Sequence, residues 1–515
     1  MTFLELLGEL AQGAPTGGNP EITGLEHDSR RIRPGNVFVA MRGATTDGNR
    51  YSDAAIANGA VAVVSDSPEP PPRAGVAWAR VEHGRRALAL MSARFYGTPA
   101  RKLRLHGVTG TNGKTTTAFL LESILQAAGR KTVLVGTIEY HVAGEVFAAP
   151  HTTPEALDLN RLFARGVAEG ARDAVMEVSS HALAQERVYG LEFETATFTN
   201  LTRDHLDYHR DFDDYFAAKR ILFAGSGGGP PRHAVINTDD PYGARLEDFA
   251  RQHGSEVLGY GLFSGGVRAQ QLELTPAGTR FELALPRGSE KVESPLIGRV
   301  NVFNIVAAAA AAHAAGCTPA AIVAGVRALR RVPGRFERVD CGQPFSVVVD
   351  YAHTDDALKN LLTVARDFIG RTSQAGRVIT VFGCGGDRDR AKRPLMGHAA
   401  GSASDFVFIT SDNPRSEDPM SIIRQALEGV GRSGANYKVE PDRRRAIALA
   451  VAGAKPGDIV LIAGKGHEKV QVLRDGPVPF DDVTVAREEL RAAGFSAETS
   501  HAAGFPPPEP ARGRR

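Results

Sequence analysis

The segment Gly110-Thr111-Asn112-Gly113-Lys114-Thr115-Thr116 constrains the fold of this chain more than any other stretch. It follows a strand-like run at residues 103–108 and precedes a helical run that extends to Ala128. A strand, a glycine turn and a helix in this order form a phosphate-binding loop, because backbone N–H groups and the helix N-terminus face the phosphate. Lys114 is expected to neutralise phosphate charge, and the Thr115 hydroxyl is expected to hold Mg²⁺.

The glycine spacing of this loop departs from the strict pattern GxxxxGK[ST], because Val108 occupies the position of the first glycine. An ordinary glycine turn is the alternative. The position of the motif between a strand and a helix favours the phosphate loop.

Four more apolar runs follow the loop and alternate with helical segments. They span residues 132–135, 174–176, 195–199 and 234–236. Continuous apolar strands are typical of parallel sheets that helices cover on both faces. We therefore predict a mostly parallel central sheet, extended by an antiparallel patch at residues 270–274 and 280–285.

A smaller domain is predicted on each side of this central one. The first hundred residues contain strand-like runs at 37–40 and 60–64, a helical run at 54–58, and a surface loop at prolines 68 and 70–72. A turn at 332–335 precedes further strand-like runs at 347–349, 378–382, 406–409 and 459–462. The predicted class is α/β with three domains, at residues 1–100, 101–334 and 335–498, the last of them Rossmann-like. Residues 499–515 are expected to form a disordered tail.

The composition argues against several classes of partner. Lys and Arg number 61 and Asp and Glu number 59, so a formal charge of +2 provides no general attraction to nucleic acid or membranes. No apolar stretch approaches the roughly 20 residues of a membrane span, and the N-terminus is typical of an amphipathic helix rather than a signal peptide. Cys317, Cys341 and Cys384 lie far apart, which predicts reduced thiols. We expect a cytoplasmic monomer with local sites for anionic ligands.

Two polar segments follow predicted strands. Glu177 comes directly after the run at 174–176, at the strand end that faces the ligand crevice of α/β sheets, where a carboxylate can bind Mg²⁺. The segment NLTRDHLDYH, residues 200–209, can form a metal site or simply a polar helix start. Both interpretations stay open at this stage.

A series of motifs occurs in the order found in one enzyme family. They are TGTNGKTT, MEVSSHAL, TNLTRDHLDYH, the lysine of YFAAKRILF, VPGRFERV, VDYAHTDDALKN, GCGGDRDRAKRPLMG, SDNPRSEDP and AGKGHE. On these motifs, which extend from about Gly24 to Glu468, the sequence resembles the Mur ligases. The N-terminal stretch DSRRIRPGNVFVAMRGATTDG is also similar to the nucleotide-sugar domain of that family.

The resemblance implies an enzyme whose first domain binds a UDP-linked precursor, whose second binds ATP, and whose third helps to hold ATP and an incoming amino acid. Such ligases use ATP to convert a carboxylate into an acyl phosphate, and the amine of the amino acid then displaces phosphate. The implied substrates are UDP-N-acetylmuramoyl-L-alanyl-D-glutamate, meso-diaminopimelate and ATP, with Mg²⁺ as the metal. A lysine together with magnesium suits a site that must screen several negative charges.

The family motifs also imply site residues. The catalytic set matches Lys114, Glu177, His205 and Lys219, and the metal ligands match Thr115, Glu177, His205 and Lys219, the last as a carbamate formed with carbon dioxide. ATP is expected to contact Gly110, Thr111, Asn112, Gly113, Lys114, Thr115, Thr116, Asn301 and Arg335, with Asp350 and His353 nearby. The UDP precursor is expected to contact Ser29, Thr152, Thr153, Ser179, Gln185 and Arg187, beside the turn Ala44-Thr45-Thr46. Two positions depart from the family pattern, His27 in place of leucine and Asp355 in place of proline.

The motif Asp412-Asn413-Pro414-Arg415 implies which amino acid is added, because it resembles the form that selects meso-diaminopimelate over lysine. The two amino acids differ by a distal carboxylate, for which the guanidinium of Arg415 offers a planar fork. Asp412 and Asn413 can receive the distal ammonium, and Arg388, Gly464 and Glu468 match the remaining contacts. The alternative is that Arg415 caps a neighbouring helix.

Two other functions remain open. Folylpolyglutamate synthetase shares the phosphate loop, but it should lack the uridine-type N-terminal domain and the DNPR motif. A regulator that binds ATP without joining any substrates is the second. The presence of Lys114, Glu177, His205 and Lys219 argues against that regulator.

Overall fold

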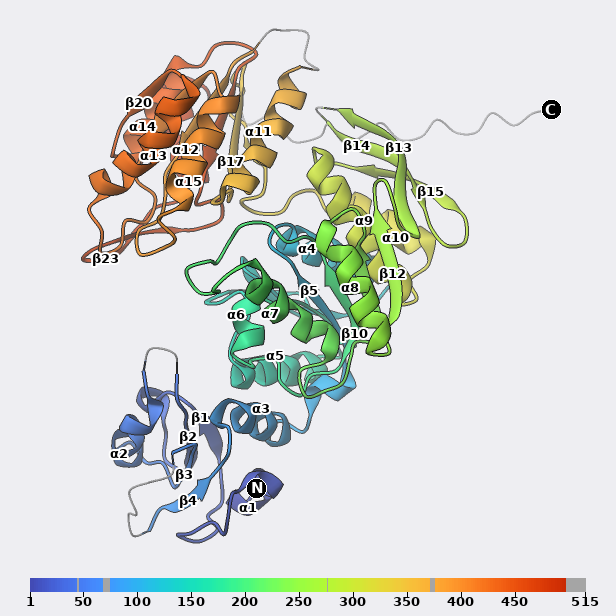
Figure 1. The fold of residues 1–515 in the computed structure, drawn as a ribbon, viewed down its shortest axis with the longest axis vertical. Helices are drawn as coiled ribbons and strands as arrows, with labels where there is room; N and C mark the ends of the chain where they lie inside the picture. The colour runs from blue at the N-terminus through green and yellow to red at the C-terminus, as the bar shows by residue number, and fades with distance from the viewer. Residues whose placement is uncertain (44–45, 68–74, 276, 371–375, 497–515) are drawn as a thin grey trace, which may run out of the picture.

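The computed structural model describes residues 1–43, 46–67, 75–275, 277–370 and 376–496, and it shows three lobes that follow one another along the chain (Figure 1). Each lobe is built around its own sheet with helices against it, so the predicted α/β class is confirmed. The predicted proline loop, the positions Ala44 and Thr45 and the predicted tail at 499–515 lie outside the described residues.

The N-terminal lobe contains a parallel sheet in the order β1-β2-β3-β4. Its elements are α1 (Phe3–Leu7), β1 (Gly24–Glu26), β2 (Asn36–Ala40), α2 (Ser52–Ala57), β3 (Ala62–Ser65), β4 (Ala77–Arg80) and α3 (Gly84–Phe95). Successive residues of β2 and β3 face opposite sides, because side chains alternate along a strand. Val39 and Val64 join the core beneath α1 and α3, whereas Phe38 and Val63 pack toward α2.

The central lobe contains an eleven-stranded sheet in the order β15-β14-β13-β12-β11-β10-β5-β9-β6-β7-β8. The strands are β5 (Arg104–Thr109), β6 (Thr132–Val135), β7 (Glu139–Val142), β8 (Glu145–Ala148), β9 (Asp173–Glu177), β10 (Phe193–Phe198), β11 (His233–Asn237), β12 (Glu256–Gly261), β13 (Val267–Thr275), β14 (Gly278–Ala284) and β15 (Ser289–Ser294). The adjacent strands β13, β12, β11, β10, β5, β9 and β6 run parallel to one another. The predicted antiparallel patch is formed by β13, β14 and β15.

Helices cover both faces of the central sheet. They are α4 (Lys114–Ala127), α5 (Ala156–Ala168), α6 (Ser180–Ala184), α7 (Phe212–Ala224), α8 (Pro241–Gln252), α9 (Arg299–Ala314) and α10 (Pro319–Ala328). Leu134, Val175 and Val235 pack on the side of α4, α9 and α10, and the strand residues next to them pack on the side of α5, α7 and α8. Burial on both faces is the reason that these strands appear in the sequence as unbroken apolar runs.

The C-terminal lobe contains a sheet in the order β16-β17-β21-β18-β19-β20, parallel except for β16. Its strands are β16 (Glu337–Val339), β17 (Ser346–Asp350), β18 (Val378–Phe382), β19 (Phe406–Ile409), β20 (Tyr437–Val439) and β21 (Ile459–Ala463), followed by a separate hairpin of β22 (Val470–Leu473) and β23 (Gly476–Pro479). Its helices are α11 (Asp355–Ile369), α12 (Lys392–Ala403), α13 (Pro419–Ser433), α14 (Arg443–Gly453) and α15 (Asp482–Ala492). The first three cover one face of the sheet and the last two cover the other.

Some predicted elements differ in extent. The N-terminal helix ends at Leu7 and is followed by a short 3₁₀ turn, because Gly8 has a positive φ of 54° that interrupts the α-helix and favours glycine. The antiparallel pair β7 and β8, at one edge of the central sheet, was not predicted from the sequence. The β8 segment is largely exposed and therefore lacks the apolar run on which the other strands were predicted.

Candidate functional site

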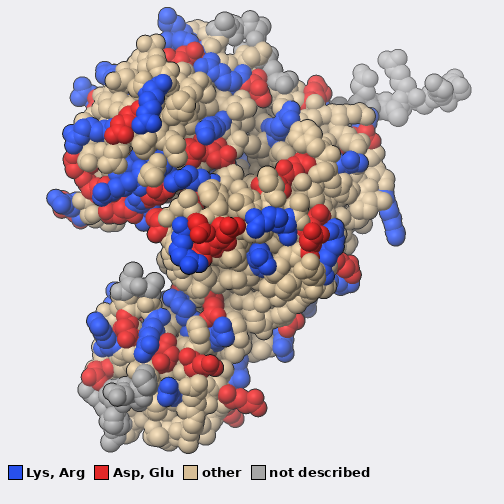
Figure 2. Space-filling model, in the orientation of Figure 1, with Lys and Arg blue, Asp and Glu red and all other residues tan. Residues whose placement is uncertain are grey.

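A cavity of about 950 Å³ lies at the carboxyl edge of the central sheet, where the C-terminal lobe faces it. The neighbouring strands β11, β10, β5, β9 and β6 all run parallel, so the segments that follow them meet at this edge. Asn237, Thr199, Gly110, Glu177 and Thr137 line the cavity for that reason. On the face seen in Figure 2, positive and negative side chains are intermixed over all three lobes, so this face presents no continuous patch of one sign.

The phosphate loop connects β5 to α4 and lines this cavity. Gly113 has a φ of 86° and immediately precedes the helix, a conformation that favours glycine. The loop is fixed from β10, because Thr199 Oγ1 donates to the carbonyl of Asn112 at 2.6 Å and the N–H of Asn112 donates to Asn200 Oδ1 at 2.9 Å. The predicted loop therefore has the position and the support that phosphate binding requires.

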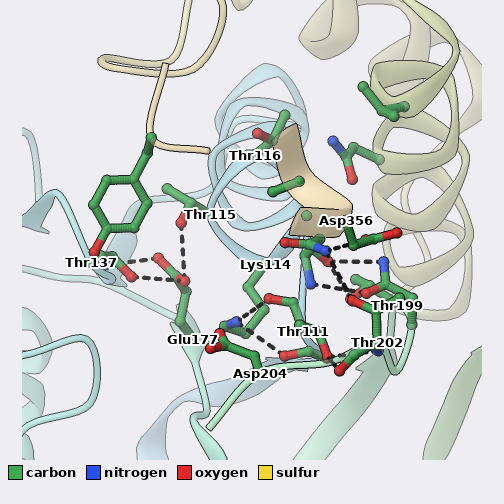
Figure 3. Close-up of a pocket in the computed structure, with 18 of the residues that line it drawn as sticks. Thr111, Lys114, Thr115, Thr116, Thr137, Glu177, Thr199, Thr202, Asp204 and Asp356 are labelled. Atoms are coloured by element: carbon green, nitrogen blue, oxygen red, sulfur yellow. Dashed lines mark hydrogen bonds between the residues drawn. The ribbon is translucent and has the colours of Figure 1, made fainter. Parts of the chain in front are cut away.

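The side chain of Lys114 is half-buried against its own loop. Its ammonium donates to the carbonyls of Gly110 at 3.0 Å and Thr111 at 2.8 Å, so it bonds to its own loop (Figure 3). Burial lowers the pKa of Lys114, and the charges of Glu177 and Asp204 oppose that shift. These contacts hold the ammonium of Lys114 against the loop that is predicted to bind phosphate.

Thr115 and Glu177 meet at the start of α4. The Thr115 hydroxyl donates to Glu177 Oε2 at 3.0 Å, and Thr137 donates to the same carboxylate from its N–H at 2.7 Å and its hydroxyl at 3.0 Å (Figure 3). Glu177 is fully buried. The site thus offers hydroxyl and carboxylate oxygens close together, which are the donors that Mg²⁺ prefers.

His205 and Asp204 lie beside this pair in the cavity wall. His205 Nε2 is 3.4 Å from Asp204 Oδ2, and burial lowers the pKa of His205 to about 3. Although burial opposes it, the charge of Lys392 and the backbone N–H of His205, which donates to Asp204 Oδ1 at 2.9 Å, help to hold the pKa of Asp204 below its ordinary value. A neutral imidazole keeps the nitrogen lone pair that a metal ligand needs.

The segment 200–209 does not form a metal site by itself. Among the described residues, no three His, Cys, Asp or Glu side chains gather closely enough to hold a metal ion. His209 is buried instead, where its Nε2 pairs with Ser180 Oγ at 2.9 Å and its ring stacks on Tyr215. A polar connection ahead of α7 is therefore the better description of this segment.

Lys219 lies on α7 and projects toward the phosphate loop. Its side chain is 1% exposed, its Nζ donates to the Gly110 carbonyl at 2.8 Å, and it lies 4.3 Å from the centre of the Tyr215 ring. Burial, and next the charge of Lys114, lower the pKa of Lys219 well below its ordinary value. Removing its proton is therefore easier than for a surface lysine.

Four of the six residues predicted for the UDP precursor line the cavity: Thr152, Thr153, Ser179 and Arg187. Arg187 donates to the Thr153 carbonyl at 2.8 Å and to Gln185 Oε1 at 2.8 Å, so Gln185 lies behind Arg187 rather than in the cavity wall. Ser29 is buried in the N-terminal lobe and is not part of the wall either.

The predicted nucleotide residues beyond the loop come from the other side of the cavity. Asn301 lies in the first turn of α9 and donates to the Ile297 carbonyl at 2.8 Å. Arg335 donates to Thr115 Oγ1 at 3.2 Å and lies over the ring of Tyr351. Asp350 and His353 also line the cavity. Residues from two lobes therefore approach the same phosphate loop.

The residues predicted for the amino acid gather at the carboxyl edge of the C-terminal sheet. Arg388 follows β18 and lines the main cavity, and Asp412, Asn413, Pro414, Arg415, Gly464 and Glu468 follow β19 and β21 outside its wall. The strands β21, β18 and β19 are neighbours, so these loops are adjacent. This edge is the expected ligand position in an open α/β sheet.

Arg415 and Arg388 form no ion pair with any described residue. Arg415 Nη1 donates to the carbonyl of Gly386 at 2.8 Å, and burial and then the charge of Arg388 lower the pKa of Arg415. Gly386 lies in the loop before α12, so the guanidinium does not cap the end of a helix. Two neighbouring guanidinium groups without a carboxylate partner create a favourable site for an anionic group.

The side-chain oxygen of Asn413 already accepts two hydrogen bonds from the protein. Its Oδ1 accepts from Lys465 Nζ at 3.1 Å and from the N–H of Val472 at 2.9 Å, and its Nδ2 donates to Glu468 Oε2 at 2.8 Å. Asn413 is 5% exposed. Its amide therefore supports the loop, which differs from the expected contact with an ammonium group.

Several site residues carried no prediction. Thr137, Asp204 and Asp356 line the cavity, and Lys465 lies inside the amino-acid loops. Thr137 could have been found, because it follows the apolar run of β6 just as Glu177 follows that of β9. Asp356 and Lys465 contact residues that are distant from them in the sequence, and no local sequence pattern indicates such contacts.

Comparison with known proteins adds to this geometry. Three family models match the chain: "Mur ligase family, catalytic domain" at residues 21–96, "Mur ligase middle domain" at 108–312, and "Mur ligase, glutamate ligase domain" at 334–466. The chain is 54% identical over 483 residues to the UDP-N-acetylmuramoyl-L-alanyl-D-glutamate–2,6-diaminopimelate ligase of Solibacter usitatus (strain Ellin6076), which covers 94% of this chain and 96% of that protein.

Solved structures are similar over nearly the whole length. A structure of a UDP-N-acetylmuramoyl-L-alanyl-D-glutamate–2,6-diaminopimelate ligase aligns with a TM-score of 0.65 and 35% identity, covering 92% of this chain and 96% of that one. A MurF ligase from Thermotoga maritima in complex with ADP shares the fold with a TM-score of 0.62 and 18% identity, covering 91% of this chain and 98% of that one.

Proposed function

This chain belongs to the Mur ligase family, and from that premise we propose that it joins meso-diaminopimelate to the D-glutamate of UDP-N-acetylmuramoyl-L-alanyl-D-glutamate at the expense of ATP. The observation that carries the proposal is the pair of Arg388 and Arg415, which have no anionic partner among the described residues and lie beside the phosphate-loop cavity. Lysine would leave that positive site without its carboxylate. The reaction belongs to peptidoglycan precursor synthesis.

The residues of the chain support the two chemical steps. The phosphate loop and Lys114 bind and screen the phosphates of ATP while the substrate carboxylate attacks the terminal phosphorus, which breaks the bond to the bridging oxygen, releases ADP and gives an acyl phosphate. Thr152, Thr153, Ser179 and Arg187 orient the muramoyl-peptide in the same cavity. The amine of diaminopimelate then attacks the activated carbonyl, and phosphate leaves from the tetrahedral intermediate.

The residues present fit a magnesium site. Thr115, Glu177 and the neutral His205 would hold the ion, which would supply positive charge for the oxygens of the transferring phosphoryl group. Lys219 fits the proposed carbamate, because its lowered pKa favours the neutral amine that reacts with carbon dioxide. A carbamate there would supply an anionic oxygen ligand.

Location and assembly are part of the same proposal. Among the helices of the described residues, none is both long enough and apolar enough to span a bilayer. We place the reaction in the cytoplasm and expect the chain to act as a monomer.

The test is to incubate the protein with UDP-N-acetylmuramoyl-L-alanyl-D-glutamate, ATP, Mg²⁺ and either meso-diaminopimelate or lysine, and to weigh the product. We expect a product with the mass of the diaminopimelate adduct, together with phosphate release that requires both substrates. Lys114→Ala is the matched negative control and should release no phosphate. Equal use of lysine by the wild type would refute the proposed specificity, and phosphate release without an acceptor would point to a simple nucleotidase.

A further inference from the structure

Lys465 is a fully buried lysine in the loop that follows β21, with 0% of its surface exposed. Its ammonium donates to Asn413 Oδ1 at 3.1 Å, Glu468 Oε2 at 2.9 Å and the Val470 carbonyl at 2.7 Å. An ammonium has three protons, so every donor of Lys465 is used inside the protein. The side chain cannot bind a ligand while these three bonds are in place.

The three acceptors belong to three different segments around the amino-acid site. Asn413 lies in the loop after β19, Glu468 in the loop after β21, and Val470 starts the hairpin of β22 and β23. The hairpin holds the loop after β19 by further bonds: Gln471 Nε2 donates to the Asp412 carbonyl at 2.6 Å, and the N–H of Arg415 donates to the Val472 carbonyl at 3.0 Å. Lys465 is therefore the charged centre that these segments share.

The bonds of Lys465 also fix how the polar groups point. Because Asn413 Oδ1 accepts from Lys465, its Nδ2 is the atom that meets Glu468 Oε2 at 2.8 Å. Glu468 Oε2 receives two donors, whereas Glu468 Oε1 accepts no hydrogen bond from the described residues. Burial raises the pKa of Glu468, but Lys465 and Asn413 more than offset that effect, so the carboxylate stays ionised.

We propose that Lys465 is a positioning residue that sets the specificity of the amino-acid site: it turns Glu468 so that Oε1 can receive the ammonium of the incoming amino acid, and it holds the loop that carries Arg415. This inference rests on the proposed function, since the amino acid in question is diaminopimelate. It assigns the recognition of the ammonium to Glu468 and leaves Asn413 as its support.

The experiment compares Lys465→Met with the wild type and with Lys469→Met. Methionine removes the charge and retains a similar length, while Lys469 lies in the same segment but is exposed and forms an ion pair with Asp481. KM is measured separately for meso-diaminopimelate, ATP and the UDP precursor, and kcat/KM is measured for meso-diaminopimelate and for lysine. Tm is recorded for each variant.

We expect Lys465→Met to raise KM for meso-diaminopimelate by about tenfold or more and to reduce its preference over lysine, because charge-assisted bonds are lost at the pocket. KM for ATP and for the precursor should change by less than about twofold, and Lys469→Met should match the wild type. An unchanged KM for meso-diaminopimelate would overturn the proposal. A parallel rise in all three KM values, with a fall in Tm, would show a structural role only.

A double variant keeps the test informative if Lys465→Met does not fold. Lys465→Met combined with Glu468→Gln removes both charges of the buried pair and should restore folding. Because the orientation of Glu468 is the main route by which Lys465 acts on the amino acid, the double variant should have a KM for meso-diaminopimelate within about threefold of that of Glu468→Gln alone, and a further rise of about tenfold or more would contradict the proposal. If the wild type incorporates a different amino acid, the proposed function fails, and the same comparison is then made with that amino acid.

Discussion

The protonation of individual charged residues in the cavity depends on partners that are distant in the sequence. Lys219 from α7 and Lys114 from α4 both donate to the carbonyl of Gly110. Two ammonium groups that share one acceptor repel each other, which is the second cause of the lowered pKa of Lys219. The neutral form of Lys219 is thereby favoured at the position where the family resemblance implies a carbamate.

Replacing Lys219 by alanine tests that modification. We expect Lys219→Ala to be nearly inactive and to regain part of its activity when formate is added, because the missing group would be an anion. Phosphate release is measured with formate, with methylamine and with neither. Rescue by methylamine instead of formate would show that Lys219 functions as an unmodified ammonium.

Arg415 is the residue on which the choice of amino acid depends. We expect Arg415→Ala to lower kcat/KM for meso-diaminopimelate by about 10²-fold and to change the low activity with lysine much less, because only the former carries the distal carboxylate. The ratio of the two kcat/KM values is the measurement. Arg424→Ala, on an exposed turn of α13, is the control and should keep the wild-type ratio.

Residue types in the site were predictable, whereas their orientations were not. The motifs located Lys114, Glu177 and Lys219 in one cavity, as the structure shows. The sequence could not indicate that the Lys114 ammonium bonds its own loop, or that both polar atoms of Asn413 are used by Lys465 and its neighbours. Such contacts join segments far apart in the chain and leave no periodic signal.

At the scale of whole elements, one ion pair connects α12 to the loop that precedes α13. Arg393 is fully buried, and its guanidinium donates to Glu417 at 2.8 and 3.0 Å, to Gln425 at 2.9 Å and to the Gly385 carbonyl at 3.1 Å. Gly385 and Glu417 flank the loops that carry Arg388 and Arg415. The pair therefore fixes the distance between the two arginines of the amino-acid site.

The same pair predicts a pH dependence of stability. The hydrogen bond from Arg393 lowers the pKa of Glu417 from 4.5 to about 2. A lowered folded-state pKa stabilises the fold fully above the unfolded value, and this contribution is lost as the pH falls from about 4.5 to about 2. Glu417→Gln should reduce the free energy of unfolding by about 3 kcal/mol at pH 7, since it leaves a buried guanidinium without its anion.

Urea unfolding of Glu417→Gln and of the wild type between pH 7 and pH 2 is the measurement. The difference between the two free energies of unfolding should become smaller as the pH falls from about 4.5 to about 2. Glu428→Gln removes an exposed partner of Arg432 on α13 and should behave as the wild type does. A difference that stays constant with pH would show that the Glu417 charge contributes nothing to stability.

Sequence patterns predicted the buried strands well and the exposed ones poorly. The strands β18 and β19 have the predicted bounds, because both of their faces lie under helices and every residue is apolar or small. The strands β8 and β20 escaped prediction, because they lie at sheet edges and bury no residue. Burial on both faces is what makes a strand visible in a sequence.

For the molecule as a whole, the central and C-terminal lobes meet across the phosphate loop. Asp356 at the start of α11 accepts from Asn112 Nδ2 at 2.8 Å, and Figure 3 shows it next to the loop. Arg203 pairs with Asp389 at 3.4 Å across the same gap. These contacts depend on the arrangement of two lobes, which no segment of the sequence specifies alone.

Removing the contact of Asp356 should weaken nucleotide binding. We expect Asp356→Ala to raise KM for ATP by on the order of tenfold, because the C-terminal lobe loses a charge-assisted bond to the phosphate loop. KM for each substrate and the radius of gyration in solution with and without ATP are the measurements. Asp367→Ala, on the exposed side of the same helix, is the control, and an unchanged KM for ATP in Asp356→Ala would mean that the contact does not contribute to binding.

The loops of the amino-acid site and the loops of the nucleotide site come from different parts of the molecule. The loops after β18, β19 and β21 that surround Arg415 come from the C-terminal lobe alone, whereas the nucleotide groups come from both sides of the cavity. In evolutionary terms, the choice of building block is a separable module. Changes confined to a few loops at one sheet edge can alter the choice of cell-wall residue and leave the nucleotide site next to them unchanged.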